Sequence, residues 1–121
     1  MNQRLRKEDR NVLILISDAF DPTLPAILSK YGEVTSEKER IAEATVVLIR
    51  SKTKVTKEYI DAATKLKLVI RGGVGLDNVD VDYARSKHIM VYNTAEASTI
   101  AVAELTFALM IALPKIGRAH V

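Results

Sequence analysis

Short apolar runs recur along the chain, and segments with a helical pattern separate them. Four runs are rich in Val, Ile and Leu and do not alternate with polar residues: Val12–Ile16, Val46–Ile49, Leu68–Ile70 and Ile89–Tyr92. This pattern is typical of strands buried on both faces, as in a parallel sheet covered by helices. Glu33–Thr35 predicts a weaker strand at an edge of the sheet.

The intervening segments carry helix start and stop signals. They predict helices over residues 22–31, 36–44, 57–63, 81–86 and 98–113. Strand and helix therefore alternate along the chain, which predicts right-handed crossovers and an α/β fold. We expect a flavodoxin-like parallel sheet of order 2-1-3-4-5, flanked by helices. Each predicted helix has an N-cap residue of a favoured type at its start: Asp21, Ser36, Thr56, Asp80, and Ser98 or Thr99.

The last predicted helix is apolar on nearly all sides. Between Ile100 and Leu113 only Glu104 and Thr106 are polar, and Pro114 ends the segment. A helix that is apolar all round needs cover on several sides, and one sheet covers only one. We therefore expect another domain or a second copy of the chain to cover the rest.

Composition and charge exclude several classes of protein. Apolar residues make up 48% and charged residues 27%, which is typical of a globular domain. There is no Cys, and the two histidines, His88 and His120, lie far apart, so no metal site is predicted. The net charge of +3 is too small to indicate a nucleic-acid partner. No apolar run reaches the ~18 residues of a membrane span, so no membrane association is predicted.

The N-terminal segment MNQRLRKEDR is charged throughout and predicts a solvated tail over residues 1–10. The apolar run that follows is too short for the hydrophobic region of a secretory signal. A cytoplasmic location is therefore expected.

Two polar segments follow neighbouring predicted strands. Arg71-Gly72-Gly73-Val74-Gly75 comes directly after Leu68–Ile70, and glycine permits the positive φ angles that an anion-binding loop of backbone amides needs. Arg50-Ser51-Lys52-Thr53 follows Val46–Ile49. Taken alone, the first segment is equally well explained as a tight turn, and the second is better explained as a solvated loop. In the predicted strand order they meet, and together they favour a site for carboxylate or phosphate.

Four spaced segments resemble the D-2-hydroxyacid dehydrogenase family: residues 50–56 (RSKTKVT), 68–80 (LVIRGGVGLDNVD), 91–94 (VYNT) and 101–106 (AVAELT). In that family a flavodoxin-like substrate domain is joined to a Rossmann domain, with the active site between them. The resemblance implies a small anionic 2-hydroxy acid as substrate and NAD as cofactor. The family's G-x-G-x-x-G and its catalytic Arg, Glu and His match nothing in this sequence. No catalytic residue is therefore predicted, and the chain alone is expected to be inactive.

The resemblance also implies an organisation for the chain. Residues 1–10 would be the tail and residues 11–97 the substrate-binding domain. Residues 98–121 would be the crossover helix with a truncated linker. Residues 100–113 would also form the interface of a homodimer, which would account for their apolar character.

Roles for individual residues follow from the same resemblance. The loop Gly73–Gly75 would hold the substrate carboxylate through the amides of Val74 and Gly75, and Arg50, Ser51 and Arg71 would face a distal phosphate. Ser98 would also bind the substrate, and Val74 and Val102 would bind the cofactor.

The sequence departs from the family pattern at three places. Ala95 and Ser98 stand where the family has Pro and a substrate-contacting Asn, and His88 stands where it prefers Gly. A left-handed conformation is therefore expected at His88. Two other classes remain open at this point: a non-catalytic module that binds anions and dimerises, and a flavodoxin-like signalling receiver. The receiver is the weaker alternative, because Asp18 and Asp21 are the only acidic residues close behind the first strand.

Overall fold

A single parallel sheet forms the centre of the molecule. The computed structural model describes residues 12–96 and 98–113. Five strands lie in the order β2-β1-β3-β4-β5, and every pairing is parallel, which confirms the predicted order 2-1-3-4-5. The strands are β1 (Leu13–Ile16), β2 (Glu33–Thr35), β3 (Val46–Ile49), β4 (Leu68–Gly72) and β5 (Met90–Thr94).

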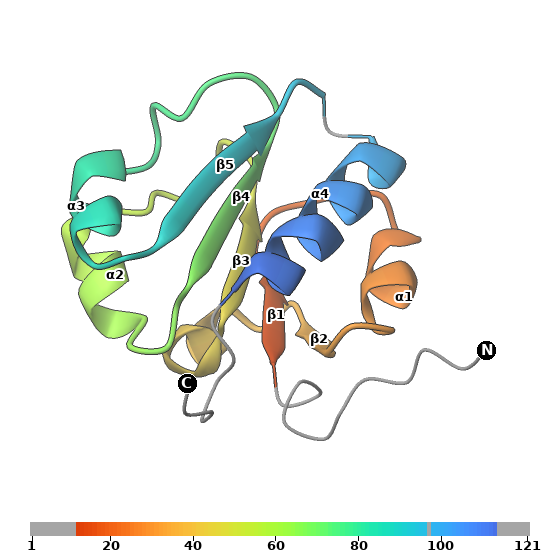
Figure 1. The fold of residues 1–121 in the computed structure, drawn as a ribbon, viewed down its shortest axis with the longest axis horizontal. Helices are drawn as coiled ribbons and strands as arrows, with labels where there is room; N and C mark the ends of the chain where they lie inside the picture. Colours follow the sequence, from red (N-terminus) through yellow and green to blue (C-terminus); the bar gives the residue numbers. More distant parts are fainter. Residues whose placement is uncertain (1–11, 97, 114–121) are drawn as a thin grey trace.

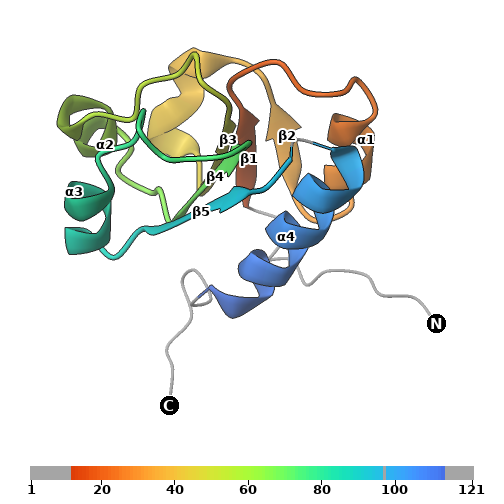
Figure 2. The same ribbon diagram turned by 90° about the horizontal axis from the view of Figure 1, so that it is seen from above.

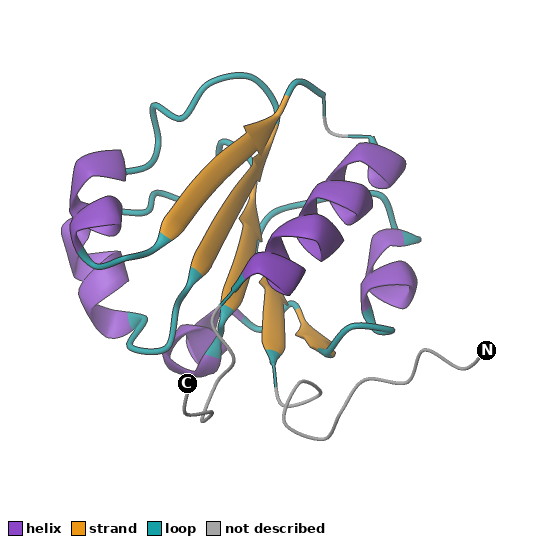
Figure 3. Ribbon diagram, viewed as in Figure 1, coloured by secondary structure: helices purple, strands orange, loops and turns teal. Residues whose placement is uncertain are grey.

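Helices cover both faces of this sheet (Figures 1 and 2). On one face lie α2 (Lys57–Ala62), α3 (Val81–Ser86) and the 3-10 helix η2 (Lys38–Glu43); on the other lie α1 (Leu24–Leu28) and α4 (Thr99–Ala112). The strands all point the same way, so the loops that follow them gather at one edge of the sheet (Figure 3). The predicted α/β class is confirmed.

The strands divide the core into two layers. Leu13, Leu15, Val47 and Val69 pack toward α2 and α3. Their sequence neighbours on the same strands pack toward α1 and α4: Ile14, Ile16, Val46, Leu48, Leu68 and Ile70. Because successive residues of a strand point to opposite faces, a strand in this sheet needs apolar residues at both alternating positions. This explains the unalternating runs in the sequence.

Helix α4 is buried on one side only. Val102, Ala103 and Thr106 are buried against the sheet and α1. On the other side Ile100 is 69% exposed, Phe107 40% and Ile111 60%. In the described parts of the chain no helix has both the length and the apolar character to cross a bilayer.

Three predicted N-caps are confirmed. Thr56, Asp80 and Ser98 each accept a hydrogen bond from the amide three residues further on, at the starts of α2, α3 and α4. His88 has φ 64°, so the left-handed conformation expected after α3 is also confirmed.

Two predicted helix starts are wrong. Asp21 does not cap α1; its carboxylate accepts from the amide and hydroxyl of Thr23, and Thr23 is the N-cap. Ser36 does not cap the next helix either. The N-cap of η2 is Glu37, whose amide donates to the Thr35 hydroxyl, and the segment is 3-10 rather than α. In both places local side chain–backbone bonds compete with a longer helix.

A buried strand position should be far more sensitive than an exposed loop position to the same substitution. Val47 is 0% exposed and Val74 is 77% exposed. We expect Val47→Ala to lower the free energy of unfolding by about 2 kcal/mol, from lost burial and a residual cavity. Val74→Ala should change it by less than about 0.5 kcal/mol. Urea denaturation measures both, and equal effects would contradict the assignment of the core.

Candidate anion-binding site

The two polar segments predicted to meet do lie together. In the register of β3 and β4, Ile49 is level with Arg71, so Arg50 leaves the sheet beside the start of the glycine loop. A hollow of about 330 Å³ opens at this point. It contains four of the predicted site residues, namely Arg50, Ser51, Arg71 and Gly73, together with Asp18, Ala19, Lys52 and Gly72.

The glycine loop keeps two backbone amides without an internal acceptor. Gly73 and Gly75 have φ 132° and 89°, conformations that L side chains rarely adopt. Gly73 donates its N–H to the Thr94 hydroxyl at 3.3 Å, so this amide is already used. Across the described ranges, 12–96 and 98–113, the amides of Val74 and Gly75 donate no hydrogen bond. Those two donors are available to an anion.

Arg71 lies against this loop. A Cβ placed on Gly75 would be 3.4 Å from Nη1 of Arg71, so the loop and the guanidinium are in contact. The Arg71 side chain is 13% exposed, and its Nη1 lies 3.0 Å from Oδ1 of Asp77, whose side chain is 92% exposed. An ion pair with so exposed a partner is weak. Arg71 is therefore held near the loop and can exchange Asp77 for another anion.

Arg50 is the exposed cation of the pair. Its guanidinium carbon lies 6.0 Å from the centre of the Phe20 ring, the outer limit of a cation–π contact. Of the ion pairs found among the described residues, none involves Arg50. Its charge therefore remains available for a ligand in the hollow.

Asp18 anchors the loop that carries Arg50. Its carboxylate accepts from the Arg50 amide at 2.7 Å, the Thr53 amide at 2.9 Å and the Thr53 hydroxyl at 2.6 Å. Burial alone would raise the pKa of Asp18, but hydrogen bonds from Thr53 and Arg50 and the nearby charge of Lys38 outweigh it and lower that pKa. Sequence reasoning missed this role. The available signal was an acidic residue directly beyond a central strand.

Asn78 holds the same loop from the opposite side. Its Nδ2 donates to the carbonyls of Arg50 at 2.7 Å and Thr53 at 2.8 Å. Asn78 lies in the turn that the Val79 amide closes by donating to the Leu76 carbonyl at 3.0 Å, as its residue type favours. Its side chain also bonds across two strand-end loops, and Asp80 rather than Asn78 caps α3.

The other predicted site residues do not line this hollow: Val74 and Gly75 follow it along the glycine loop, and Ser98 and Val102 belong to α4 and its N-cap. The Ser98 hydroxyl accepts from the Ala101 amide at 3.2 Å as the N-cap of α4. Val102 is 0% exposed and packs in the core beneath the sheet. Their roles toward substrate and cofactor stay predictions, whereas Val74 is 77% exposed beside the loop amides.

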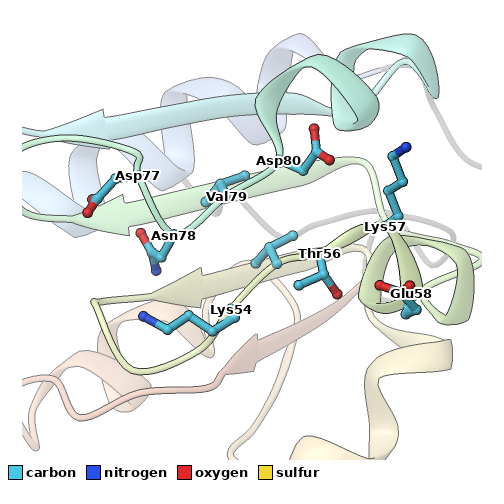
Figure 4. A pocket seen from close by; sticks show the side chains of 9 residues that line it. Lys54, Thr56, Lys57, Glu58, Asp77, Asn78, Val79 and Asp80 are labelled. Carbon is cyan, nitrogen blue, oxygen red and sulfur yellow. The ribbon is translucent and has the colours of Figure 1, made fainter.

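A second, larger hollow of about 590 Å³ lies between residues 54–58 and 77–80 (Figure 4). Lys54 and Lys57 line it, but so do Glu58, Asp77 and Asp80. Acidic side chains oppose the binding of an anion here, so the hollow beside Arg50 and Arg71 is the better candidate.

Comparison with known proteins places the chain in a family. The profile described as D-isomer specific 2-hydroxyacid dehydrogenase, catalytic domain, matches residues 14–121. The chain therefore belongs to the D-2-hydroxyacid dehydrogenases, which confirms the resemblance seen in its four motifs.

Two curated relatives and one solved structure show how similar the chain is to known proteins. The chain is 46% identical over 109 residues to the D-3-phosphoglycerate dehydrogenase of Methanocaldococcus jannaschii, a match covering 84% of this chain and 21% of that protein. It is also 46% identical over 116 residues to the hydroxypyruvate reductase of Thermotoga maritima, covering 88% and 38%. The NAD+-bound 3-phosphoglycerate dehydrogenase of Entamoeba histolytica superposes with a TM-score of 0.57 at 31% identity, covering 69% and 32%. The chain thus spans well under half the length of these relatives.

The buried carboxylate of Asp18 predicts a pH-dependent contribution to stability. Because the pKa of Asp18 is lowered in the folded chain, its ionised form stabilises the fold above the unfolded-state pKa, and this stabilisation is lost as pH falls through the folded-state pKa. We expect Asp18→Asn to lower the free energy of unfolding at pH 7 by about 1–3 kcal/mol. The deficit should shrink below about pH 4.

Urea denaturation at several pH values tests this expectation. Asp77→Asn is the matched control, because the Asp77 side chain is 92% exposed and its removal should change stability little. A deficit for Asp18→Asn that is the same at pH 3 and pH 7 would show that its charge does not matter.

Proposed function

We propose that this chain is the substrate-binding part of an NAD-dependent D-2-hydroxyacid dehydrogenase, and that its substrate is 3-phospho-D-glycerate, oxidised to 3-phosphooxypyruvate in serine biosynthesis. The observation that carries the proposal is the pairing of two kinds of anion donor at adjacent strand ends. The unused amides of Val74 and Gly75 lie on one loop, and the guanidiniums of Arg50 and Arg71 belong to the same edge.

The two ends of such a substrate fit these donors. A carboxylate accepts well from two adjacent backbone amides, and a phosphate accepts well from arginine forks. Held at both ends, the substrate would present the carbon between them at a fixed orientation, which is the contribution that binding makes to catalysis. Arg71, already paired with the exposed Asp77, would turn toward the incoming anion.

NAD accepts the hydride when it is bound, and this chain offers only part of its surroundings. The exposed Val74 side chain, beside the loop amides, provides an apolar surface suited to a nicotinamide ring. Val102 is fully buried and offers no such surface from its side chain in this structure. We expect hydride transfer to need residues beyond these 121, so the chain by itself should form no NADH from substrate.

A substrate without a phosphate is the competing possibility. The hydroxypyruvate reductase of Thermotoga maritima is as similar to this chain as the phosphoglycerate dehydrogenase of Methanocaldococcus jannaschii, at 46% identity each. Arg50, which is exposed and in no ion pair with another described residue, favours the phosphorylated substrate, because a small carboxylate held by the loop amides gives that cation nothing to bind.

Ligand binding to the chain provides the direct test. Titration of 3-phospho-D-glycerate into 15N-labelled protein should shift the amide signals of Val74 and Gly75 first, with an affinity of about 1 mM for a site open to water. Arg50→Ala should weaken this binding by about threefold to tenfold, as expected for an exposed charge pair with phosphate.

Arg85→Ala is the matched control, because Arg85 is an exposed arginine on α3, away from the hollow. It should leave the affinity unchanged. Shifts that cluster around Lys54–Lys57 and Asp77–Asp80 instead would move the site to the second hollow. Equal affinity for hydroxypyruvate and 3-phospho-D-glycerate would favour the reductase activity.

We also propose that the chain forms a homodimer through residues 100–113. Ile100, Phe107 and Ile111 are exposed on one side of α4, which also carries the exposed Glu104. Phe107 packs partly on the Tyr31 ring at 4.5 Å, and a two-fold axis would let the remaining apolar surface pack against its own copy. Sedimentation should show a dimer, and Ile111→Glu should shift it to monomer without unfolding. Ala62→Glu, at an exposed position of α2, should leave the dimer intact. A monomer before any substitution would contradict the proposal.

A further inference from the structure

The loop that carries Arg50, residues 50–53, is held mainly through its backbone. On its N–H side, the Asp18 carboxylate accepts from the amides of Arg50 and Thr53. On its C=O side, Nδ2 of Asn78 donates to the carbonyls of the same two residues. Residues 50–53 are therefore fixed at both ends and from both directions by the side chains of two residues that are each only 8% exposed.

Thr53 adds a side-chain contact to this arrangement. Its hydroxyl lies 2.6 Å from Oδ1 of Asp18 and 2.8 Å from the hydroxyl of Ser17. Because Ser17 and Asp18 directly follow β1, the loop after β3 is tied to the end of the neighbouring strand. The bonds to Asp18 are charge-assisted, which makes them stronger and more directional than neutral ones.

Asn78 joins this loop to the glycine loop. It lies in the segment that continues from Gly75, and Val55 forms an isolated parallel bridge with Val79. The Val55 amide donates to the Asn78 carbonyl and the Asp80 amide to the Val55 carbonyl, both at 2.9 Å. Figure 4 shows the two segments side by side, with Asn78 directed between them. The two halves of the candidate site are thus one connected unit.

We infer that Asp18 and Asn78 are positioning residues, which set the place of Arg50 relative to the amides of Val74 and Gly75 and so select substrates that carry a distal phosphate. The inference rests on the proposed function. Neither side chain needs to touch the ligand, because all three bonds of Asp18 and both bonds of Asn78 go to residues 50 and 53.

The arrangement separates two kinds of ligand. A molecule with only a carboxylate binds the loop amides and is indifferent to where Arg50 lies. A molecule with a phosphate at its far end bridges from the amides to Arg50, so its affinity depends on the separation between them. Loosening the Arg50 loop should therefore lower the affinity for the phosphorylated ligand alone.

The test compares 3-phospho-D-glycerate with D-glycerate by NMR titration of the chain. Asp18→Asn and Thr53→Val should each weaken 3-phospho-D-glycerate binding by about threefold to tenfold and change D-glycerate binding by less than twofold. Thr53→Ser keeps the hydroxyl and should restore the preference. A role confined to stability would lower the urea midpoint of the variants and leave the ratio of the two affinities unchanged.

The outcomes separate the two proposals. If the unsubstituted chain does not prefer 3-phospho-D-glycerate, the proposed function fails, and the positioning role fails with it. If the chain has that preference and Thr53→Val retains it in full, only the positioning role is overturned. Should Asp18→Asn not fold, the Thr53 variants decide the matter, because Thr53→Val removes one hydroxyl at a partly exposed position and Thr53→Ser keeps it.

Discussion

Burial of both faces of one parallel sheet is the constraint on which the rest of this structure depends. Successive residues of the central strands enter different apolar layers, so both faces need helices, and each return to the sheet must cross over one of them. Crossovers of this kind bring every strand end with its following loop to the same edge. Arg50 and Arg71 become neighbours for this reason, although a complete helix lies between them in the chain.

The electrostatic arrangement at that edge is uneven. Arg71 is mostly buried and already paired with Asp77, whereas Arg50 is exposed, lines the hollow and lies 6.0 Å from the centre of the Phe20 ring. The carboxylate of Asp18 lies in the same hollow but has its oxygens committed to three donors, so much of its charge is satisfied within the protein. An anion entering the hollow meets the two cations Arg50 and Arg71, while the Asp18 carboxylate beside them is already hydrogen-bonded within the protein.

Much of the fold could be predicted from the sequence, because burial patterns and glycine positions are local signals. The caps at Thr56, Asp80 and Ser98 follow from neighbouring residues, and the strand order follows from the crossovers that alternating strands and helices require. The start of α1 could not be predicted, because the Asp21 carboxylate accepts from the amide and hydroxyl of Thr23, and the folded backbone decides this choice.

The candidate site, too, could be predicted from the sequence only in part. Arg50 and Arg71 could be brought together from strand order alone, since each stands directly beside a predicted strand end. The roles of Asp18 and Asn78 could not be predicted. Their partners lie 32 and 28 residues away and are backbone atoms, which are the same for almost every residue type and so leave no pattern in the sequence. The hydrogen bond from the Gly73 amide to the Thr94 hydroxyl could not be predicted either, because it joins the ends of two neighbouring strands.

The backbone anchoring of residues 50–53 has an evolutionary consequence. Asp18 and Asn78 hold amides and carbonyls that every residue type except proline possesses, so the side chains at positions 50, 51 and 52 are free to change without loss of the loop's shape. A scaffold of this kind can exchange one substrate for another through very few mutations. Relatives with different names at equal identity, a phosphoglycerate dehydrogenase and a hydroxypyruvate reductase, are the kind of divergence such a loop permits.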